Sequence, residues 1–274
     1  IRNASNNENF IFYKNDICNT EDMILYCTVH NIDWIINFAA ETHVDNSIES
    51  SKSFVKTNVD GVRSLLDSCI ATGANLFQIS TDEVYGSIGH GFFRETDQLD
   101  PKNPYSATKA AAEHLVTAYS NTHGIDYLMV RMSNNFGPRQ HREKFIPTIL
   151  RKLLSGNKIP VYGDGKNIRD WLYVKDCAQM IKRILFAGQM RNVYNLTHCN
   201  EKTNIEIATL MCEILDKNAD DFIEFVEDRK GHDFRYAIDN KRLLNIGIKN
   251  ATDFGLALDE TINYYKNNKD EDLF

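Results

Sequence analysis

The stretch Leu76-Phe-Gln-Ile-Ser-Thr-Asp-Glu-Val-Tyr-Gly86 begins with apolar side chains and ends with polar ones. Its first half is a short apolar run, which predicts a buried parallel strand over 76–80. The polar half ends at Gly86, where we expect a loop to begin. In an open α/β sheet, ligands bind beyond the carboxyl ends of the strands. Asp82 and Glu83 therefore lie where an acid/base pair can act. An isolated Asp-Glu pair is, however, more often two solvated charges in a loop.

The composition fits one large α/β domain or two smaller ones. The 274 residues are 42% hydrophobic and 25% charged, which is ordinary for a soluble globular protein. The net charge of −7 disfavours bulk binding of nucleic acid. No apolar run approaches the roughly 18 residues that a membrane span needs, and the polar start resembles no secretory signal. We therefore expect a cytoplasmic protein with no membrane and no nucleic-acid partner.

The six cysteines are scattered along the chain without a Cys-x-x-Cys pair, and several lie in apolar surroundings. This distribution is typical of reduced thiols in the core of a cytosolic protein. No spacing of His, Cys, Asp and Glu resembles a metal site, so the sequence predicts no metal.

Strands and helices alternate through the first half of the chain. Besides 76–80, the apolar runs that predict strands are 9–13, 33–40 and 127–132. A helix is predicted to begin at Thr20, which serves as its N-cap. Two further helices are predicted over 54–72, where Gly73 ends the helix, and over 105–122. Strands and helices in this alternation imply a parallel sheet with right-handed crossovers.

The pattern loosens after Ser133, where prolines and glycines separate shorter elements. There the expected helices are 176–187, 204–215 and 256–267, and the expected strands are 193–196, 222–226 and a last short one after 233. The helix 176–187 and the strand 193–196 are expected to return to the sheet. Since no repeat or linker interrupts the chain, the second half is predicted to be a smaller lobe built on that sheet.

Tyr105 and Lys109 are four residues apart, so a helix places them on one face. An ammonium group near a phenol stabilises the phenolate and lowers a pKa that starts at about 10. A tyrosine tuned in this way can take a proton from a sugar hydroxyl near neutral pH. Tyr-x-x-x-Lys is also common at the start of an amphipathic helix, so the spacing alone leaves both interpretations open.

Tyr105-Ser-Ala-Thr-Lys109, some twenty residues after Ser80-Thr-Asp-Glu-Val-Tyr-Gly86, resembles the extended short-chain dehydrogenase/reductase family. Within it, Thr81-Asp82-Glu83 is similar to the triplet of the dTDP-glucose 4,6-dehydratases, whereas the sugar-nucleotide epimerases typically lack the Asp-Glu pair. Further stretches resemble the same enzymes: Phe38-Ala-Ala-Glu-Thr-His-Val-Asp45, Ser133-Asn-Asn-Phe-Gly-Pro138, Lys144-Phe-Ile-Pro147, Arg169-Asp-Trp-Leu-Tyr173 and Asp228-Arg-Lys-Gly-His-Asp-Phe-Arg-Tyr236. The resemblance runs from about Phe10 to Asn267.

The resemblance implies an α/β fold, with a Rossmann-type parallel sheet covered by helices on both faces and a smaller C-terminal substrate-binding lobe. The NAD-binding domain is expected over 1–136 and again over 166–197, and the substrate lobe over 137–165 and 198–274. The Gly-rich turn that seats the pyrophosphate is absent, and no glycine precedes Gly61. We therefore expect that the sequence begins inside the protein and lacks its N-terminal Gly-rich βα unit.

The implied activity is NAD-dependent dehydration of dTDP-glucose to dTDP-4-keto-6-deoxyglucose. Tyr105 would take the C4 hydroxyl proton as hydride leaves C4. Lys109 would lie beside Tyr105, and Thr81 would hydrogen-bond the C4 oxygen. Glu83 would then remove the C5 proton while Asp82 protonates the departing C6 hydroxyl, and hydride would return to C6. One carboxyl must be ionised and the other protonated, and like charges this close push their pKa values apart.

The resemblance also implies binding residues. Those for NAD are Asp16, Ile17, Phe38, Ala39, Ala40, Thr57, Tyr105, Lys109 and Asn135. Those for the nucleotide sugar are Thr42, Thr81, Asn134, Lys144, Phe145, Pro160, Tyr162, Arg169, Asn204, Arg229 and His232. Taken singly, each is commonly an ordinary core or surface residue. A homodimer packed through the helices 54–72 and 105–122 is implied as well.

Several alternatives stay open at this point. A UDP-glucose 4,6-dehydratase fits nearly as well, since the contacts to the pyrimidine base cannot be separated by sequence. A UDP-sugar 4-epimerase or a decarboxylase would have to explain Asp82 and Glu83. A nucleotide-sugar-binding pseudoenzyme would follow if the Gly-rich segment were truly missing.

Overall fold

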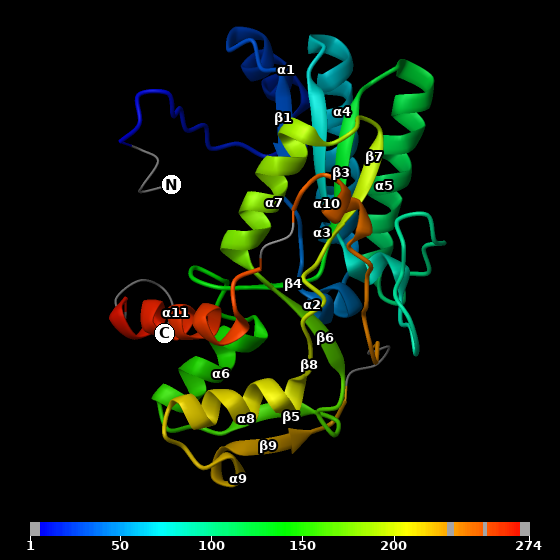
Figure 1. The fold of residues 1–274 in the computed structure, drawn as a ribbon. Helices are drawn as coiled ribbons and strands as arrows, with labels where there is room; N and C mark the ends of the chain where they lie inside the picture. Colours follow the sequence, from blue (N-terminus) through cyan, green and yellow to red (C-terminus); the bar gives the residue numbers. More distant parts are fainter. Residues whose placement is uncertain (1–5, 229–232, 249–250, 269–274) are drawn as a thin grey trace.

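A four-stranded parallel sheet forms the centre of the computed structural model, which describes residues 6–228, 233–248 and 251–268 (Figure 1). Its strands lie in the order β1 (Trp34–Asn37), β2 (Asn75–Thr81), β3 (Tyr127–Met132) and β7 (Asn192–Leu196). The pairing of β2 with β3 runs in register from Leu76 opposite Tyr127 to Thr81 opposite Met132. Because all four strands run the same way, their carboxyl ends meet at one edge, as the sequence predicted.

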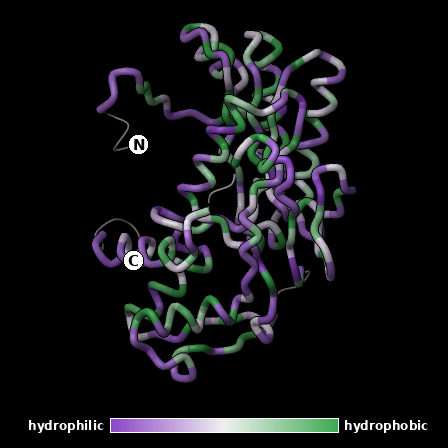
Figure 2. Tube along the Cα trace, in the orientation of Figure 1, coloured by the Kyte–Doolittle hydropathy of each residue, from purple (hydrophilic) through white to green (hydrophobic). Residues whose placement is uncertain are grey.

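Helices cover both faces of this sheet. On one face α4 (Gly61–Thr72) and α5 (Pro104–His123) pack on Leu76 and Met129, and α1 (Thr20–Val29) packs against α4. On the other face α7 (Val174–Ala187) packs on Phe77 and Leu128. Neighbouring residues of one strand thus point to opposite apolar layers, which explains why apolar side chains occupy successive positions in β2 and β3. Figure 2 shows these hydrophobic stretches gathered inside the molecule.

The start of α5 is fixed by its own sequence. The Asn103 side chain accepts from the Ser106 backbone N–H at 2.9 Å, and the Ser106 hydroxyl accepts from the Asn103 N–H at 3.3 Å. Pro104 occupies the first turn, where no backbone donor is needed. Gly124, with φ of 75°, ends the helix in the left-handed conformation that favours glycine. These caps place Tyr105 in the first turn of α5, next to the end of β2.

The helix expected over 54–72 is present, but it is interrupted. It consists of α3 (Lys52–Val55), a π-helical turn η1 (Lys56–Asp60) and α4, and Gly73 ends it as predicted. Asn58 in the π turn is buried, and its amide group donates to the Glu41 carbonyl and to the Thr108 hydroxyl, both at 3.0 Å. The π turn therefore ties the segment after β1, which continues into α2 (Val44–Glu49), to α5.

A smaller lobe follows the sheet (Figure 1). Its strands are β4 (Asn134–Phe136), β6 (Ile168–Tyr173) and β8 (Glu201–Thr203) in one sheet, and β5 (Ile159–Tyr162) with β9 (Ile223–Val226) in another. Its helices are α6 (Phe145–Leu154), α8 (Asn204–Ile214), α9 (Ala219–Phe222) and α11 (Phe254–Asn267), while α10 (Lys241–Asn245) packs back on β7. Buried residues of α6, α8 and α11, such as Leu150, Met211 and Leu258, share one core. The exact domain boundaries given above stay a prediction.

The apolar segment 9–13 is not the strand that its sequence predicted. Its side chains are exposed, from 36% for Phe10 to 58% for Ile11, and the segment runs away from the sheet (Figure 1). Tyr13 instead stacks on Tyr26 of α1, with ring centroids 4.2 Å apart. Hydrophobicity alone cannot make a strand, because its backbone groups need a neighbouring strand to pair with. No strand in the described part of the chain lies beside this segment.

Three smaller expectations also need correction. The N-cap of α1 is Asn19 rather than Thr20, since the Asn19 side chain accepts from the Asp22 N–H. The strand expected within 33–40 is shorter and less buried, with Ile36 39% exposed. In place of a last strand after 233, isolated bridges pair Arg235 with Ile168 of β6 and Ile238 with Phe93, so no pairing extends over consecutive residues.

No helix in the three described ranges is long and apolar enough to cross a membrane.

Candidate active site

The carboxyl end of β2 passes directly into a 3₁₀ turn, η2 (Asp82–Tyr85), that carries two acids. The Thr81 hydroxyl caps this turn by accepting from the Glu83 N–H at 3.3 Å. Gly86 ends it with φ of 76°, and a Cβ atom there would lie 2.5 Å from the Asp100 carbonyl oxygen. The turn is therefore fixed at both ends, with Asp82 and Glu83 projecting from the edge of the sheet.

Tyr105 meets this turn from the start of α5. Burial and the charges of Glu83 and Asp82 raise the pKa of its hydroxyl, and the Thr81 side chain opposes this shift. All five residues implied to be catalytic line one cavity of about 380 Å³. They are Thr81, Asp82, Glu83, Tyr105 and Lys109. The structure thus brings together groups that lie on different elements, as the resemblance implied.

The two carboxyl groups have different surroundings. Asp82 is 2% exposed, its Oδ2 atom has no hydrogen-bond partner, and burial together with the charge of Glu83 raises its pKa well above the usual range. Burial also raises the pKa of Glu83. The Arg169 guanidinium and a hydrogen bond from Asn103 offset part of this rise. Asp82 is therefore the group that keeps its proton, and Glu83 is the group that ionises first.

The expected effect of Lys109 on Tyr105 is wrong for this structure. The Lys109 ammonium group donates to the Ile79 carbonyl at 2.7 Å, and its own pKa is lowered by burial to about 8. The pKa of Tyr105 is raised, not lowered, by its burial and by the negative charge of Glu83. Helical spacing put both side chains on one face, but the long lysine side chain reaches the end of β2 instead of the phenol.

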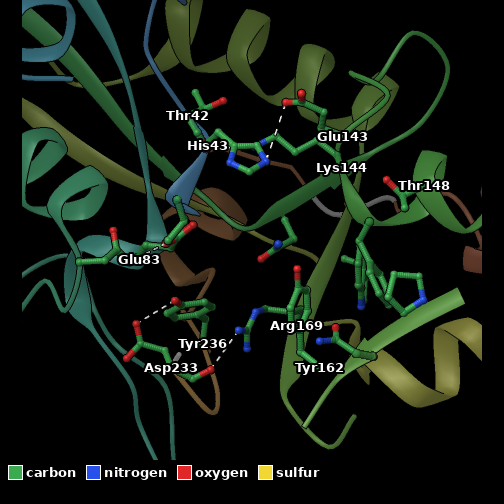
Figure 3. Close-up of a pocket in the computed structure, with 17 residues that line it drawn as sticks. Thr42, His43, Glu83, Glu143, Lys144, Thr148, Tyr162, Arg169, Asp233 and Tyr236 are labelled. Atoms are coloured by element: carbon green, nitrogen blue, oxygen red, sulfur yellow. Dashed lines mark hydrogen bonds and ion pairs between the residues drawn. The ribbon is translucent and has the colours of Figure 1, made fainter. Parts of the chain in front are cut away.

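A second cavity of about 240 Å³ adjoins the first, and the two share Thr42, Glu83, Asn134 and Lys144. Figure 3 shows Thr42, His43 and Glu143 along one side of it and Tyr162, Asp233 and Tyr236 along the other. The residues implied for the nucleotide sugar that line it are Thr42, Asn134, Lys144, Phe145, Pro160, Tyr162, Arg169 and Asn204. Arg229 and His232 lie outside the described residues.

Arg169 is held in place within this cavity by backbone carbonyls. Its guanidinium group donates to the carbonyls of Asp233 at 2.9 Å and Ile168 at 2.7 Å, and it lies 4.4 Å from the centroid of the Tyr236 ring. The Tyr236 hydroxyl in turn donates to the Asp233 carboxylate at 2.8 Å (Figure 3). The positive charge is thus fixed opposite Glu83, where it suits an anionic ligand.

Several lining residues were missed by the sequence reasoning. Asp233 and Tyr236 lie in the motif that ends at Tyr236, and Trp171 lies in the motif that begins at Arg169, so the motifs themselves were the available signal. His43 caps α2 and lies 3.8 Å from the Glu143 carboxylate. Asn103 was not singled out, because its hydrogen bond to Glu83 depends on how α5 and η2 pack together.

Only part of the implied NAD set lines the larger cavity. Phe38, Ala40, Tyr105, Lys109 and Asn135 do so. Asp16, Ile17, Ala39 and Thr57 line neither cavity. The Asp16 carboxylate accepts from the Cys18 N–H at 2.9 Å and lies 3.6 Å from the Lys56 ammonium group, so local contacts hold it.

Unpaired acceptors in the larger cavity mark it as a place for a polar ligand. Buried oxygen atoms of Ser133, Asn135 and Gln140 have no hydrogen-bond partner, and all three residues line the cavity. Buried acceptors normally find donors, so a ligand with N–H or O–H groups fits here. Among the residues that the structure describes, no cluster of His, Cys, Asp and Glu has the form of a metal site.

Comparisons with known proteins identify the kind of enzyme that carries such a site. The chain matches the family described as GDP-mannose 4,6 dehydratase over residues 1–260. It is 46% identical over 238 residues to the low-salt glycan biosynthesis protein Agl12 of Haloferax volcanii, a match covering 86% of this chain and 76% of that protein. It is 41% identical over 271 residues to the dTDP-glucose 4,6-dehydratase of Actinoplanes sp., covering 98% and 84%. The crystal structure of DesIV, the dTDP-glucose 4,6-dehydratase of Streptomyces venezuelae with NAD bound, superposes with a TM-score of 0.96 at 34% identity, covering 100% and 85%.

Proposed function

The chain belongs to the nucleotide-sugar 4,6-dehydratase family, and we propose that it catalyses the NAD-dependent dehydration of dTDP-glucose to dTDP-4-keto-6-deoxyglucose. It is a hydro-lyase, and the cofactor is unchanged over the complete cycle. The observation that carries the proposal is the pair Asp82 and Glu83, whose unlike surroundings suit one acid and one base beside Tyr105. Elimination of water needs both a base and an acid, because the base takes the proton of the C–H bond and the acid protonates the oxygen of the breaking C–O bond.

The residues present fit the reactive end of NAD. The unpaired acceptors of Ser133, Asn135 and Gln140 suit a carboxamide and ribose hydroxyls, and Lys109 lies beside them in the same cavity. Asn135, Lys109 and Tyr105 would hold this part of the cofactor, with Phe38 and Ala40 along its path. When bound, NAD supplies the acceptor and donor of hydride. The positive charge of its nicotinamide ring would lower the pKa of Tyr105, which burial raises.

The first step needs a base at the C4 hydroxyl of the sugar. Tyr105 takes that proton, and the hydroxyl of Thr81 holds the C4 oxygen in place. The resulting 4-keto group acidifies the neighbouring C5 proton. In the ligand-free protein Tyr105 is kept protonated by burial, so its activation depends on what enters the cavity.

The elimination step uses the two carboxyl groups in opposite senses. Glu83 removes the C5 proton, and Asp82 donates its proton to the C6 hydroxyl, which leaves as water. When hydride returns to C6, Glu83 gives its proton back to C5. The cycle starts from the active form, in which Tyr105 is ionised and Asp82 is protonated. After one turnover Tyr105 has gained one proton and Asp82 has lost one, so a proton moving from Tyr105 to Asp82 restores that form.

The smaller cavity is the proposed place of the nucleotide diphosphate. Arg169 and Lys144 supply positive charge for the phosphates, while Phe145, Pro160 and Tyr162 offer apolar surface to the base. Arg229 and His232 complete the proposed set by resemblance. The two cavities adjoin at Glu83 and Asn134, so the hexose of a ligand spanning both would lie against the acid pair.

We also place the protein in the cytoplasm as a homodimer. All six thiols are free, which suits a reducing compartment. On α5, Ala107, His114 and Ala118 form an exposed stripe at helical spacing that a second copy could cover, next to α4. Sedimentation of the intact protein as a monomer would contradict the dimer.

Product analysis tests the proposed function. With NAD and dTDP-glucose, the protein should release a 4-keto-6-deoxy sugar, detected by its absorbance in alkali. Release of a C4 epimer would identify an epimerase, and equal rates with UDP-glucose would remove the preference for dTDP. Binding of dTDP-glucose without NAD reduction or product would identify a pseudoenzyme.

A further inference from the structure

A buried ion pair that the proposed mechanism does not use lies behind the site. Glu113 of α5 and Arg131 of β3 are 3% and 6% exposed, and the Nη2 atom of Arg131 lies 2.6 Å from Oε2 of Glu113. The Nε atom of Arg131 also donates to both carboxylate oxygens, at 3.2 and 3.0 Å. A well-packed apolar pair is often as stable as a buried ion pair, so stability alone does not account for this one.

Both partners reach residues that flank the turn with the two acids. Ser80, directly before Thr81, donates to the Oε1 atom of Glu113 at 2.5 Å. Tyr85, the last residue of η2, accepts from the Nη1 atom of Arg131 at 2.6 Å, and the guanidinium carbon lies 4.7 Å from the centroid of its ring. One ion pair therefore holds the end of β2 and the end of η2 together.

The same ion pair also fixes the helix that brings the base. Glu113 lies one helical turn after Lys109 and two turns after Tyr105 on α5. Lys109 binds the Ile79 carbonyl, so α5 is attached to the end of β2 at two successive turns, through Lys109 and through Glu113 with Ser80. A shift of either contact moves the helix relative to the acid turn.

We infer that Glu113 and Arg131 are positioning residues that set the placement of Asp82 and Glu83 relative to the Tyr105 hydroxyl. The inference rests on the proposed dehydration, in which one hexose must contact the two carboxyl groups and the Tyr105 hydroxyl. Neither residue lines the smaller cavity, so binding of the nucleotide does not depend on the ion pair. Loss of the pair should therefore lower kcat and leave KM unchanged.

The test removes both charges together. Glu113→Gln alone leaves the Arg131 charge buried and unpaired, which destabilises the fold, so the informative variant is Glu113→Gln with Arg131→Met. In the intact protein supplied with NAD and dTDP-glucose, we expect its kcat to fall about a hundredfold, the size of effect that a misplacement of about 1 Å can cause. Tyr85→Phe keeps the ring but removes the hydroxyl that accepts from Arg131 and donates to Asn195, and it should give a smaller fall in kcat.

Ile184→Ala is the matched control. Ile184 is fully buried on α7, on the opposite face of the sheet, so its truncation lowers stability without touching the ion pair. Its kcat below the unfolding temperature should equal that of the wild type. A double variant that melts cooperatively and keeps wild-type kcat would overturn the inference, as would a fall in kcat that Ile184→Ala reproduces. A wild-type protein that forms no product refutes the proposed function instead.

Discussion

The hydroxyl of Thr81 donates to the Oδ1 atom of Asp82 at 3.3 Å, and the same side chain lines the cavity with Tyr105, whose burial-raised pKa it lowers. Thr81 therefore links the proposed base of the first step to the proposed acid of the second. In the proposed cycle Tyr105 gains a proton and Asp82 loses one. Since its hydroxyl contacts Asp82 and acts on Tyr105 in the same cavity, it offers a route by which the two groups return to their starting states.

Replacing Thr81 by valine should slow turnover by about a hundredfold, the lower range for loss of a positioned proton-transfer group. Valine keeps the shape of the side chain but removes the hydroxyl that contacts Asp82 and lowers the pKa of Tyr105. Thr81→Ser, which keeps the hydroxyl, should retain most of the activity. Steady-state kcat for dTDP-glucose measures the difference. Equal kcat for the valine and serine variants would show that the hydroxyl has no part in the reaction.

Glu83→Gln should separate the first step from the second. The glutamine cannot accept the C5 proton, so C4 oxidation and transient NADH formation continue while product release stops. Exchange of the C5 hydrogen with deuterated solvent reports the base directly, and it should disappear in this variant. Tyr105→Phe is the complementary variant, because it should form no NADH at all. C5 exchange at the wild-type rate in Glu83→Gln would show that another group is the base.

The protonation of Asp82 makes stability depend on pH. Burial raises its pKa in the folded protein above the unfolded value, so the folded state binds more protons, and the free energy of unfolding falls as the pH rises between the two values. Asp82→Asn removes this ionisation. The variant should be more stable than the wild type at neutral and alkaline pH, and the difference should vanish below about pH 4, the ordinary pKa of aspartate.

Thermal unfolding at a series of pH values measures this effect, and activity provides the second readout. Asparagine cannot protonate the leaving hydroxyl, so elimination should slow by about a hundredfold or more while C5 exchange through Glu83 continues. A variant that is more stable and less active would place Asp82 among residues whose burial serves the reaction at the expense of the fold. Equal stability of both proteins at pH 8 would contradict the raised pKa.

Local patterns in the sequence were sufficient for the elements that carry the site. The strand 76–80 could be predicted because both faces of β2 are buried, and the start of α5 follows from Asn103 and Pro104. The strand predicted at 9–13 was wrong, because the hydrophobicity of a segment does not show whether a neighbouring strand is there to pair with it. Thus the sequence located the acid turn and the Tyr105 helix before any contact was known.

Contacts between distant elements were beyond the reach of such patterns. Glu113 and Arg131 meet because α5 packs across β3, and nothing in their separate surroundings in the sequence indicates a pair. The direction of Lys109 was missed for a related reason, since the carbonyl of Ile79 that it binds belongs to another element. Spacing on a helix predicts which side chains share a face, but the neighbours of that face decide what they bind.

The charge of Arg169 should set the acidic limit of activity. This charge lowers the pKa of Glu83, which burial raises, and Glu83 must be ionised to remove the C5 proton. Arg169→Met removes the charge, so the pKa of Glu83 rises and kcat should begin to fall at a higher pH than in the wild type. Arg169→Lys keeps the charge but not the bonds to the carbonyls of Asp233 and Ile168, so it should weaken substrate binding while leaving the acidic limb in place. The profile of kcat against pH, measured below the unfolding temperature of each variant, distinguishes the two effects. If the acidic limb of Arg169→Met coincides with that of the wild type, the group that titrates there is not Glu83, and the base of the elimination must be sought elsewhere in the cavity.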